Sequence, residues 1–149
     1  MGSIARIEVK DGNPVAALQG FCARLLADEE VAAVLAPRRL PGGAGTMPAL
    51  VAEPEEFRDV DPLTPSFRIN AARMLTRLTR GADDGGLVAA LLRPCEVRAF
   101  IELCKLNQGS LENALLVSLD CAGAFSNADY PRFAGGDGAA EPLMEFLRA

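Results

Sequence analysis

The segment GGLVAALLRPCEVRAFIELCKLNQ, residues 85–108, predicts a buried strand followed directly by a helix. Its first part is a continuous apolar run, typical of a strand covered on both faces of a parallel sheet. Residues 96–107 then carry apolar residues at helical spacing, and the side chains expected to face inward are Val97, Phe100, Ile101 and Cys104. A second apolar run, NALLVSLD, follows at residues 113–120. We therefore expect one βαβ unit over residues 86–120.

Strand and helix patterns also alternate over the rest of the chain, which predicts an α/β fold with a mostly parallel sheet flanked by helices. The sheet is expected to contain residues 31–36, 86–92 and 114–119. Further elements are expected as follows: helices at 11–30 and 70–80, capped by Asn13 and Asn70, a short helix at 53–60, a strand at 48–54, a short edge strand at 4–9 and a terminal helix at 141–149. Residues 38–47, RRLPGGAGTM, are expected to form a long glycine-rich loop.

The composition suits one compact domain of 149 residues, of which half are apolar. No apolar run approaches the ~18–20 residues that span a bilayer, and no signal peptide is expected, so we predict a cytoplasmic protein. The formal net charge of −5 makes nucleic acid an improbable partner. The chain has no histidine, which excludes Ser-His-Asp and Cys-His catalysis and histidine-ligated zinc.

The chain has four cysteines, and no two of them form a C-x-x-C motif. This spacing excludes a self-contained zinc ribbon or ferredoxin site. Cys22 and Cys104 lie on apolar helix stripes, so both are expected to be buried and unreactive.

Cys95 and Cys121 instead follow the two strands of the βαβ unit. Pro94 suits the first helical position, so Cys95 would lie at a helix N-terminus, where the dipole lowers the pKa of a thiol. Arg93 and Arg98 add positive charge there, whereas Glu96 opposes it. The site could hold a thiolate, a metal–sulfur ligand or a cofactor phosphate, or Cys95 could simply be a small residue that fits a turn.

The segment Asp120-Cys121-Ala122-Gly123 comes just after the second strand. Parallel neighbours have their carboxyl ends on one edge of the sheet, which is where ligands bind in open α/β folds. We therefore expect Cys121 beside Cys95, next to the glycine-rich loop 42–45. That loop could wrap a cofactor or be mobile, and Arg38-Arg39 could bind phosphate or be a solvated pair.

Residues 91–126, LLRPCEVRAFIELCKLNQGSLENALLVSLDCAGAFS, resemble the beta subunit family of coenzyme F420 hydrogenases and dehydrogenases. That family includes beta subunits of certain formate dehydrogenases and of heterodisulfide-reductase-linked complexes. Its members carry a strand, a Gly-Thr-Pro-Cys-Gln or Arg-Pro-Cys-Glu turn, a helix, and a later strand that leads to a Cys-x-Gly turn. Here the matching turns are 93–96 and 121–123, and residues 36–65 are also similar to the amino-terminal part of the family.

The resemblance implies an oxidoreductase subunit that passes electrons between iron–sulfur clusters and a flavin. It implies FAD and [4Fe–4S] cofactors, with other subunits and a deazaflavin or ferredoxin as partners. Cys95 would be catalytic, Cys95 and Cys121 would ligate a cluster, and the cofactor-binding residues would be Gly42, Gly43, Gly45, Arg93, Pro94, Glu96, Arg98, Asp120 and Gly123. Family members are longer than this chain and many carry C-x-x-C-x-x-C motifs. We therefore expect either the amino-terminal part of such a subunit, inactive on its own and without cofactors bound by this chain alone, or a shorter relative with a different role.

Two other functions fit the same residues. One is a non-catalytic assembly domain that docks onto a redox partner and binds no cofactor. The other is a stand-alone thiol enzyme that uses Cys95, although the chain offers no histidine to activate the thiol.

Overall fold

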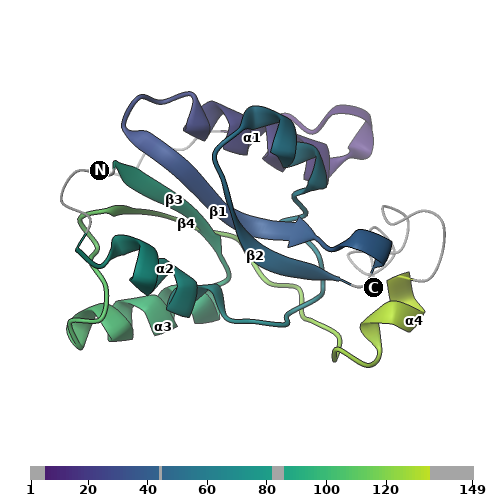
Figure 1. Cartoon of the computed structure of the whole chain (residues 1–149). Coiled ribbons are helices and arrows are strands. Elements are labelled where there is room, and N and C mark those ends of the chain that lie inside the picture. Colours follow the sequence, from purple (N-terminus) through teal and green to yellow (C-terminus); the bar gives the residue numbers. More distant parts are fainter. Residues whose placement is uncertain (1–5, 44, 82–85, 135–149) are drawn as a thin grey trace.

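The computed structural model describes residues 6–43, 45–81 and 86–134. Within them lies a sheet of four strands in the order β2-β1-β3-β4, formed by β1 (Val31–Arg39), β2 (Thr46–Val51), β3 (Leu87–Leu92) and β4 (Ala114–Ser118) (Figure 1). β1, β3 and β4 are parallel to one another, whereas β2 pairs antiparallel with β1. The predicted α/β fold and its βαβ unit are thus confirmed.

The helices begin where the capping residues predict. The longer ones are α1 (Pro14–Leu26), α2 (Ala71–Thr79) and α3 (Pro94–Lys105), followed by the short α4 (Tyr130–Ala134). Asn13 Oδ1 accepts the Ala16 N–H at 3.0 Å and Asn70 Oδ1 accepts the Ala72 N–H at 2.9 Å. Both side chains satisfy donors that a helix N-terminus leaves unpaired, so the two predicted caps are confirmed.

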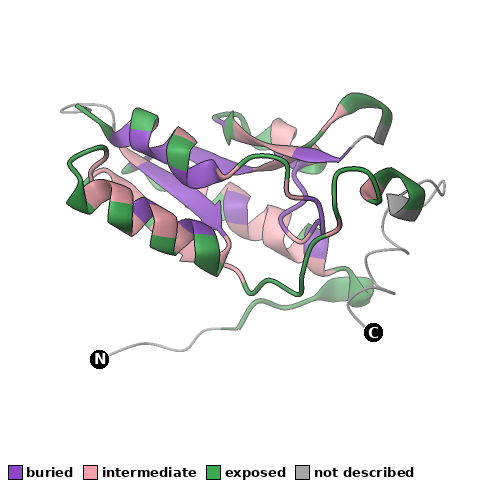
Figure 2. Cartoon of the chain, turned by 90° about the horizontal axis from the view of Figure 1, so that it is seen from below, coloured by how far each residue is buried: buried purple, intermediate pink, exposed green. Residues whose placement is uncertain are grey.

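Helices cover both faces of the sheet (Figure 1). α1 and the 3-10 helix η3 (Pro54–Asp59) pack on one face, over a cluster that includes Cys22, Val34 and Phe57. α2 and α3 pack on the other face, over a cluster that includes Leu35, Leu75 and Phe100. Seen from below in Figure 2, the buried residues follow the strands and the sides of the helices that face them. The core is therefore two apolar layers separated by the sheet.

The glycine-rich loop is shorter than predicted. β1 continues to Arg39 and β2 already begins at Thr46, where these two residues pair in the antiparallel register. Only residues 40–45 connect the strands, and they include the 3-10 turn η2 (Pro41–Gly43). The ladder extends because each added pair satisfies backbone groups that a loop would leave to solvent.

Two other expectations concern the ends of the chain. The predicted edge strand at 4–9 is wrong for residues 6–9, which are unpaired, with Ile7 and Val9 exposed. An alternating pattern forms a strand only where a neighbouring edge accepts its hydrogen bonds. Residues 1–5, and the predicted helix at 141–149, lie outside the described residues.

β4 lies at an edge of the sheet and is less buried than its apolar sequence suggests, with Leu115 37% exposed. Cys22 is buried, as predicted, whereas Cys104 is only half-buried and packs against the edge of the cluster beneath α2 and α3. Among the described residues, no helix has both the length and the apolar character required to cross a membrane.

Candidate functional site

The two exposed cysteines, Cys95 and Cys121, follow strands that end at the same edge of the sheet. Leu92 of β3 pairs with Ser118 of β4, and the Leu119 N–H donates to the Leu92 carbonyl at 2.9 Å. Cys95 and Cys121 each lie three residues beyond this pair, and both are free and exposed. Because the two strands are parallel, the register brings both cysteines to the carboxyl edge of the sheet.

Cys95 is the second residue of α3, directly after Pro94 at the first helical position. Glu96 occupies the third position, and its Oε2 accepts the Arg93 N–H at 3.0 Å, as in a capping box. Cys95 itself points outward, while its two neighbours fix the backbone around it. The Cys95 thiol therefore lies at a helix start that is held by the hydrogen bond between Glu96 and the Arg93 N–H.

Glu96 is engaged by the protein's own backbone rather than exposed to a ligand. It is only 6% exposed, and its Oε1 accepts the Ala71 N–H at 2.7 Å while Oε2 accepts the Arg93 N–H. One carboxylate thus caps α3 and also the first residue of α2. Hydrogen bonds to a charged acceptor are among the stronger ones in proteins, so Glu96 ties the two helix starts together.

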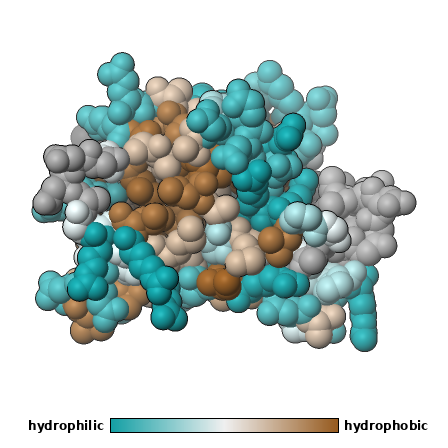
Figure 3. All heavy atoms as spheres, viewed as in Figure 1, coloured by the Kyte–Doolittle hydropathy of each residue, from teal (hydrophilic) through white to brown (hydrophobic). Residues whose placement is uncertain are grey.

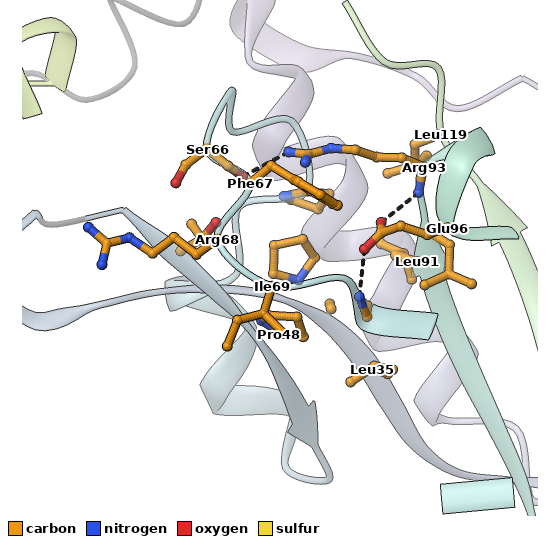
Figure 4. A pocket seen from close by; sticks show the side chains of 16 residues that line it. Leu35, Pro48, Ser66, Phe67, Arg68, Ile69, Leu91, Arg93, Glu96 and Leu119 are labelled. Carbon is orange, nitrogen blue, oxygen red and sulfur yellow. Dashed lines mark hydrogen bonds between the residues drawn. The ribbon is translucent and has the colours of Figure 1, made fainter. Parts of the chain in front are cut away.

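Arg93 holds a loop across the carboxyl edge. Its Nη2 donates to the Thr64 carbonyl at 2.8 Å and to the Ser66 carbonyl at 2.9 Å, and its guanidinium lies 4.8 Å from the centre of the Phe67 ring (Figure 4). These contacts fix residues 62–69 over the ends of β1 and β3. The Arg93 guanidinium, which was predicted to bind a cofactor phosphate, therefore already binds backbone carbonyls of its own chain.

Two cavities of about 30 Å³ each flank Arg93. The first is lined mainly by apolar residues such as Leu35, Pro48 and Ile69 (Figure 4). The second is lined by Leu119, Asp120, Cys121 and Gly123, together with Arg93. Such volumes hold one or two water molecules, whereas cofactor pockets occupy about 300–1,000 Å³.

The described residues do not fit a flavin at this edge. Both cavities are far too small for a ring system, and Arg93 and Glu96 already bind backbone groups. Arg98 and Asp120 are exposed on the surface nearby, and neither lines the first cavity. The thiols of Cys95 and Cys121 are accessible ligands, whereas the cofactor-binding roles predicted for Arg93, Pro94 and Glu96 stay a prediction.

The arginine pair after β1 is neutralised by acids. Arg38 contacts Glu56 at 2.6 Å and Asp59 at 3.3 Å, and Arg39 contacts Asp61 at 3.3 Å. Burial raises the pKa of Asp61 above its usual range, while the Arg39 guanidinium opposes that rise. An open groove of about 440 Å³ runs beside this pair, and Asp59 also lines it. A phosphate there would have to displace carboxylates.

In the connection between β1 and β2, backbone conformation and close packing favour glycine. Gly42 has φ +76° in the turn after Pro41, and Gly43 completes that turn. Gly45 has φ +116°, and a Cβ added to it would lie 2.8 Å from Ser66 Oγ. Gly45 thus lies against Ser66, whose carbonyl accepts a hydrogen bond from Arg93. Gly123, with φ +125°, lets the chain turn after Cys121.

Changing Gly45 to alanine is expected to lower the free energy of unfolding by about 2 kcal/mol, because the new Cβ meets Ser66 in a strained backbone conformation. Urea denaturation of the purified chain measures the effect. Gly42→Ala is the matched control, since the space around Gly42 is open and only the backbone strain remains. An equal decrease in the free energy of unfolding for the two variants would show that the contact with Ser66 does not destabilise Gly45→Ala.

The four thiols are expected to react with iodoacetamide in a fixed order. Burial raises the pKa of Cys22 to about 11, and burial also raises the pKa of Cys104. Thiolate is the reacting form, so Cys95 and Cys121 should be labelled first, Cys104 slowly and Cys22 only after unfolding. Peptide mass spectrometry after timed labelling at neutral pH reads this order. Early labelling of Cys22 would contradict the observed core.

Sequence reasoning missed the double role of Glu96 and the contribution of residues 62–69. The capping-box spacing pointed to the bond from Glu96 to the Arg93 N–H, whereas nothing in the pattern linked Glu96 to Ala71, because that contact is made between helices. Over residues 6–43, 45–81 and 86–134, no three cysteine, aspartate or glutamate residues gather as a metal site. No protein-family model matches the chain.

Proposed function

We propose that this chain is a domain of an electron-transfer subunit in an oxidoreductase complex, and that it presents Cys95 and Cys121 as two thiolate ligands of an iron–sulfur cluster. The observation that carries the proposal is the parallel β3–β4 register, which brings two free, exposed thiols to one sheet edge. A [4Fe–4S] cluster takes four cysteine ligands, so the other two come from a further part of the protein or from a partner subunit.

The chain's own contribution is to position the two thiols. Glu96 fixes the start of α3 and therefore the backbone of Cys95. Arg93 fixes the loop whose residues Pro62, Leu63 and Thr64 line the cavity next to Cys121. A cluster supplies one-electron chemistry when bound, and deazaflavin or ferredoxin is the proposed electron partner. A flavin, if the complex uses one, would be held by residues outside this edge.

A second function is favoured by a different observation. Arg93 and Glu96 both bind backbone groups of the protein, and the cavities at the edge are water-sized. A domain that docks onto a redox partner without binding a cofactor needs neither a large pocket nor charged side chains that face a ligand. Both functions predict association with other redox subunits, but only the first requires the cysteines.

Reconstitution of the full chain distinguishes these two functions. Anaerobic incubation with ferric iron and sulfide, in excess 2-mercaptoethanol that reduces part of the iron and supplies the remaining thiolates, should give a brown protein that keeps iron through gel filtration. Cys95→Ser and Cys121→Ser should each lose most of that iron, while Cys104→Ser keeps it. Iron binding that is absent in the unchanged chain, or equal in all four proteins, would leave the assembly domain as the better account.

A further inference from the structure

α2 presents a row of arginines to solvent. Arg73, Arg77 and the C-cap residue Arg80 are exposed, and none of them forms an ion pair with another residue in the described part of the chain. Residues three and four positions apart are neighbours on a helix surface, so the three side chains form one continuous basic row. Figure 3 shows hydrophilic side chains standing out where α2 lies in Figure 1, below a hydrophobic area of the surface.

A second row of side chains on α2, which is apolar, lies directly beside the arginines. Met74 and Leu78 are half-buried and four positions apart. Met74 precedes Arg77 by three positions, so the two rows are in contact on the helix surface. The other flank of the helix is covered, because Thr76 packs against Gly109 of the connection between α3 and β4. The basic row and the apolar row therefore form one surface, on the side of α2 away from that connection.

The position of Arg73 is unfavourable for the helix itself. Arg73 is the third residue of α2, whose first turn contains no acidic residue. A cation near a helix N-terminus opposes the helix dipole, and like charges four positions apart, as in Arg73 and Arg77, repel each other. Arg77 and Arg80 suit the dipole, since both lie near the C-terminus of the helix. The stability of α2 thus accounts for the last two arginines but not for Arg73, which points to a role in binding.

We propose that this surface of α2 docks an acidic amphipathic helix of another protein subunit. A helix with carboxylates beside an apolar row is complementary to it, because its acids pair with the arginines while its apolar row covers Met74 and Leu78. Arginine binds carboxylates through two parallel hydrogen bonds, and arginine and methionine are enriched at protein interfaces. Nucleic acid fits less well, because the net charge of −5 repels phosphates around the basic row. The inference does not depend on whether Cys95 and Cys121 bind a cluster.

Two synthetic helical peptides of identical composition test the proposal. In the first peptide, glutamates at positions i, i+4 and i+7 lie beside a row of leucines, and in the second the same residues are scattered around the helix. The full chain should bind the first peptide at least about tenfold more tightly, because only that peptide presents both rows together. Fluorescence anisotropy of the labelled peptides measures the two dissociation constants. Equal dissociation constants, or values above about 1 mM for both peptides, overturn the proposal.

Variants of the full chain locate the contact. Arg73→Glu/Arg77→Glu should raise the dissociation constant of the first peptide at least about tenfold. The matched control, Arg24→Glu/Arg132→Glu, replaces exposed arginines of α1 and α4 and changes the net charge by the same amount. It should leave the dissociation constant within about threefold. An equal loss of binding in the two double variants overturns the proposal, as does tighter binding of single-stranded DNA than of the first peptide by the unchanged chain.

A charge exchange removes misfolding as an explanation. The first peptide with its glutamates replaced by lysines should bind Arg73→Glu/Arg77→Glu but not the unchanged chain, because the basic and acidic rows have then changed sides. The circular dichroism spectrum of the variant shows whether it keeps its fold. A folded variant that fails to bind the lysine peptide contradicts a docking contact through this surface of α2.

Discussion

Replacement of Glu96 by alanine is expected to lower the free energy of unfolding by about 4 kcal/mol. The change leaves the N–H groups of Ala71 and Arg93 without their acceptor at a buried site, and each unsatisfied donor costs about 1–3 kcal/mol. Because one carboxylate joins the starts of α2 and α3, the loss should affect both helices. Urea denaturation followed by circular dichroism measures the change.

Two further variants separate capping from a general effect on α3. Glu96→Gln keeps one carbonyl acceptor but turns its amide toward a backbone N–H, so an intermediate loss of about 2 kcal/mol is expected. Glu102→Ala removes an exposed acid of the same helix that pairs with Lys105 at 2.7 Å. Exposed pairs contribute little, so a loss below about 0.5 kcal/mol is expected. A Glu102→Ala loss as large as that of Glu96→Ala would refute the capping role.

Replacement of Arg93 by alanine should cost about 3 kcal/mol and release the loop at 62–69. The Thr64 and Ser66 carbonyls lose a charged donor, and Phe67 loses the guanidinium stacked on its ring. Amide hydrogen exchange should show faster exchange at residues 62–69 than in the unchanged chain. It should leave α1, on the opposite face of the sheet, unchanged.

The conservative variant Arg93→Lys tests the geometry of this contact. Lysine keeps the charge but presents a point donor on a flexible stem, so it should recover about half of the stability. Arg98→Ala, on the exposed side of the same helix, should stay within about 0.5 kcal/mol of the unchanged chain. Normal protection of residues 62–69 in Arg93→Ala would show that the loop is held by its own packing.

The fold was largely predictable because local rules and burial agree along the βαβ unit. The run Leu87–Leu92 is apolar at every position, and Pro94 and Glu96 follow at helix-start spacing, so the strand–helix junction was clear from sequence. Asn13 and Asn70 marked their helices for the same reason. At each of these positions, residues close in sequence are sufficient to predict where the helix begins.

The site was less predictable because its contacts join distant parts of the chain. Residues 62–69 have an irregular, proline-containing sequence, and only the fold shows that Arg93 reaches two of their carbonyls. The sequence left Arg38 and Arg39 as either a phosphate site or a solvated pair, whereas in the fold both bind acids some twenty residues further along. Conversely, Ile7 and Val9 alternate like a strand, yet both are exposed and pair with no strand in the described part of the chain. Sequence periodicity predicts which secondary structure a segment can form. Contacts with distant parts of the chain decide whether it forms and which groups its side chains bind.

The central claim is that Cys95 and Cys121 act as a pair, and thiol bridging by dibromobimane tests it most directly. This reagent becomes strongly fluorescent when it links two nearby thiols. The native full chain should become fluorescent, and peptide mapping should identify a cross-link between Cys95 and Cys121. Cys95→Ser and Cys121→Ser should each abolish the signal, while Cys104→Ser leaves it intact. A native chain that takes up the reagent at both cysteines without bridging them would contradict the claim.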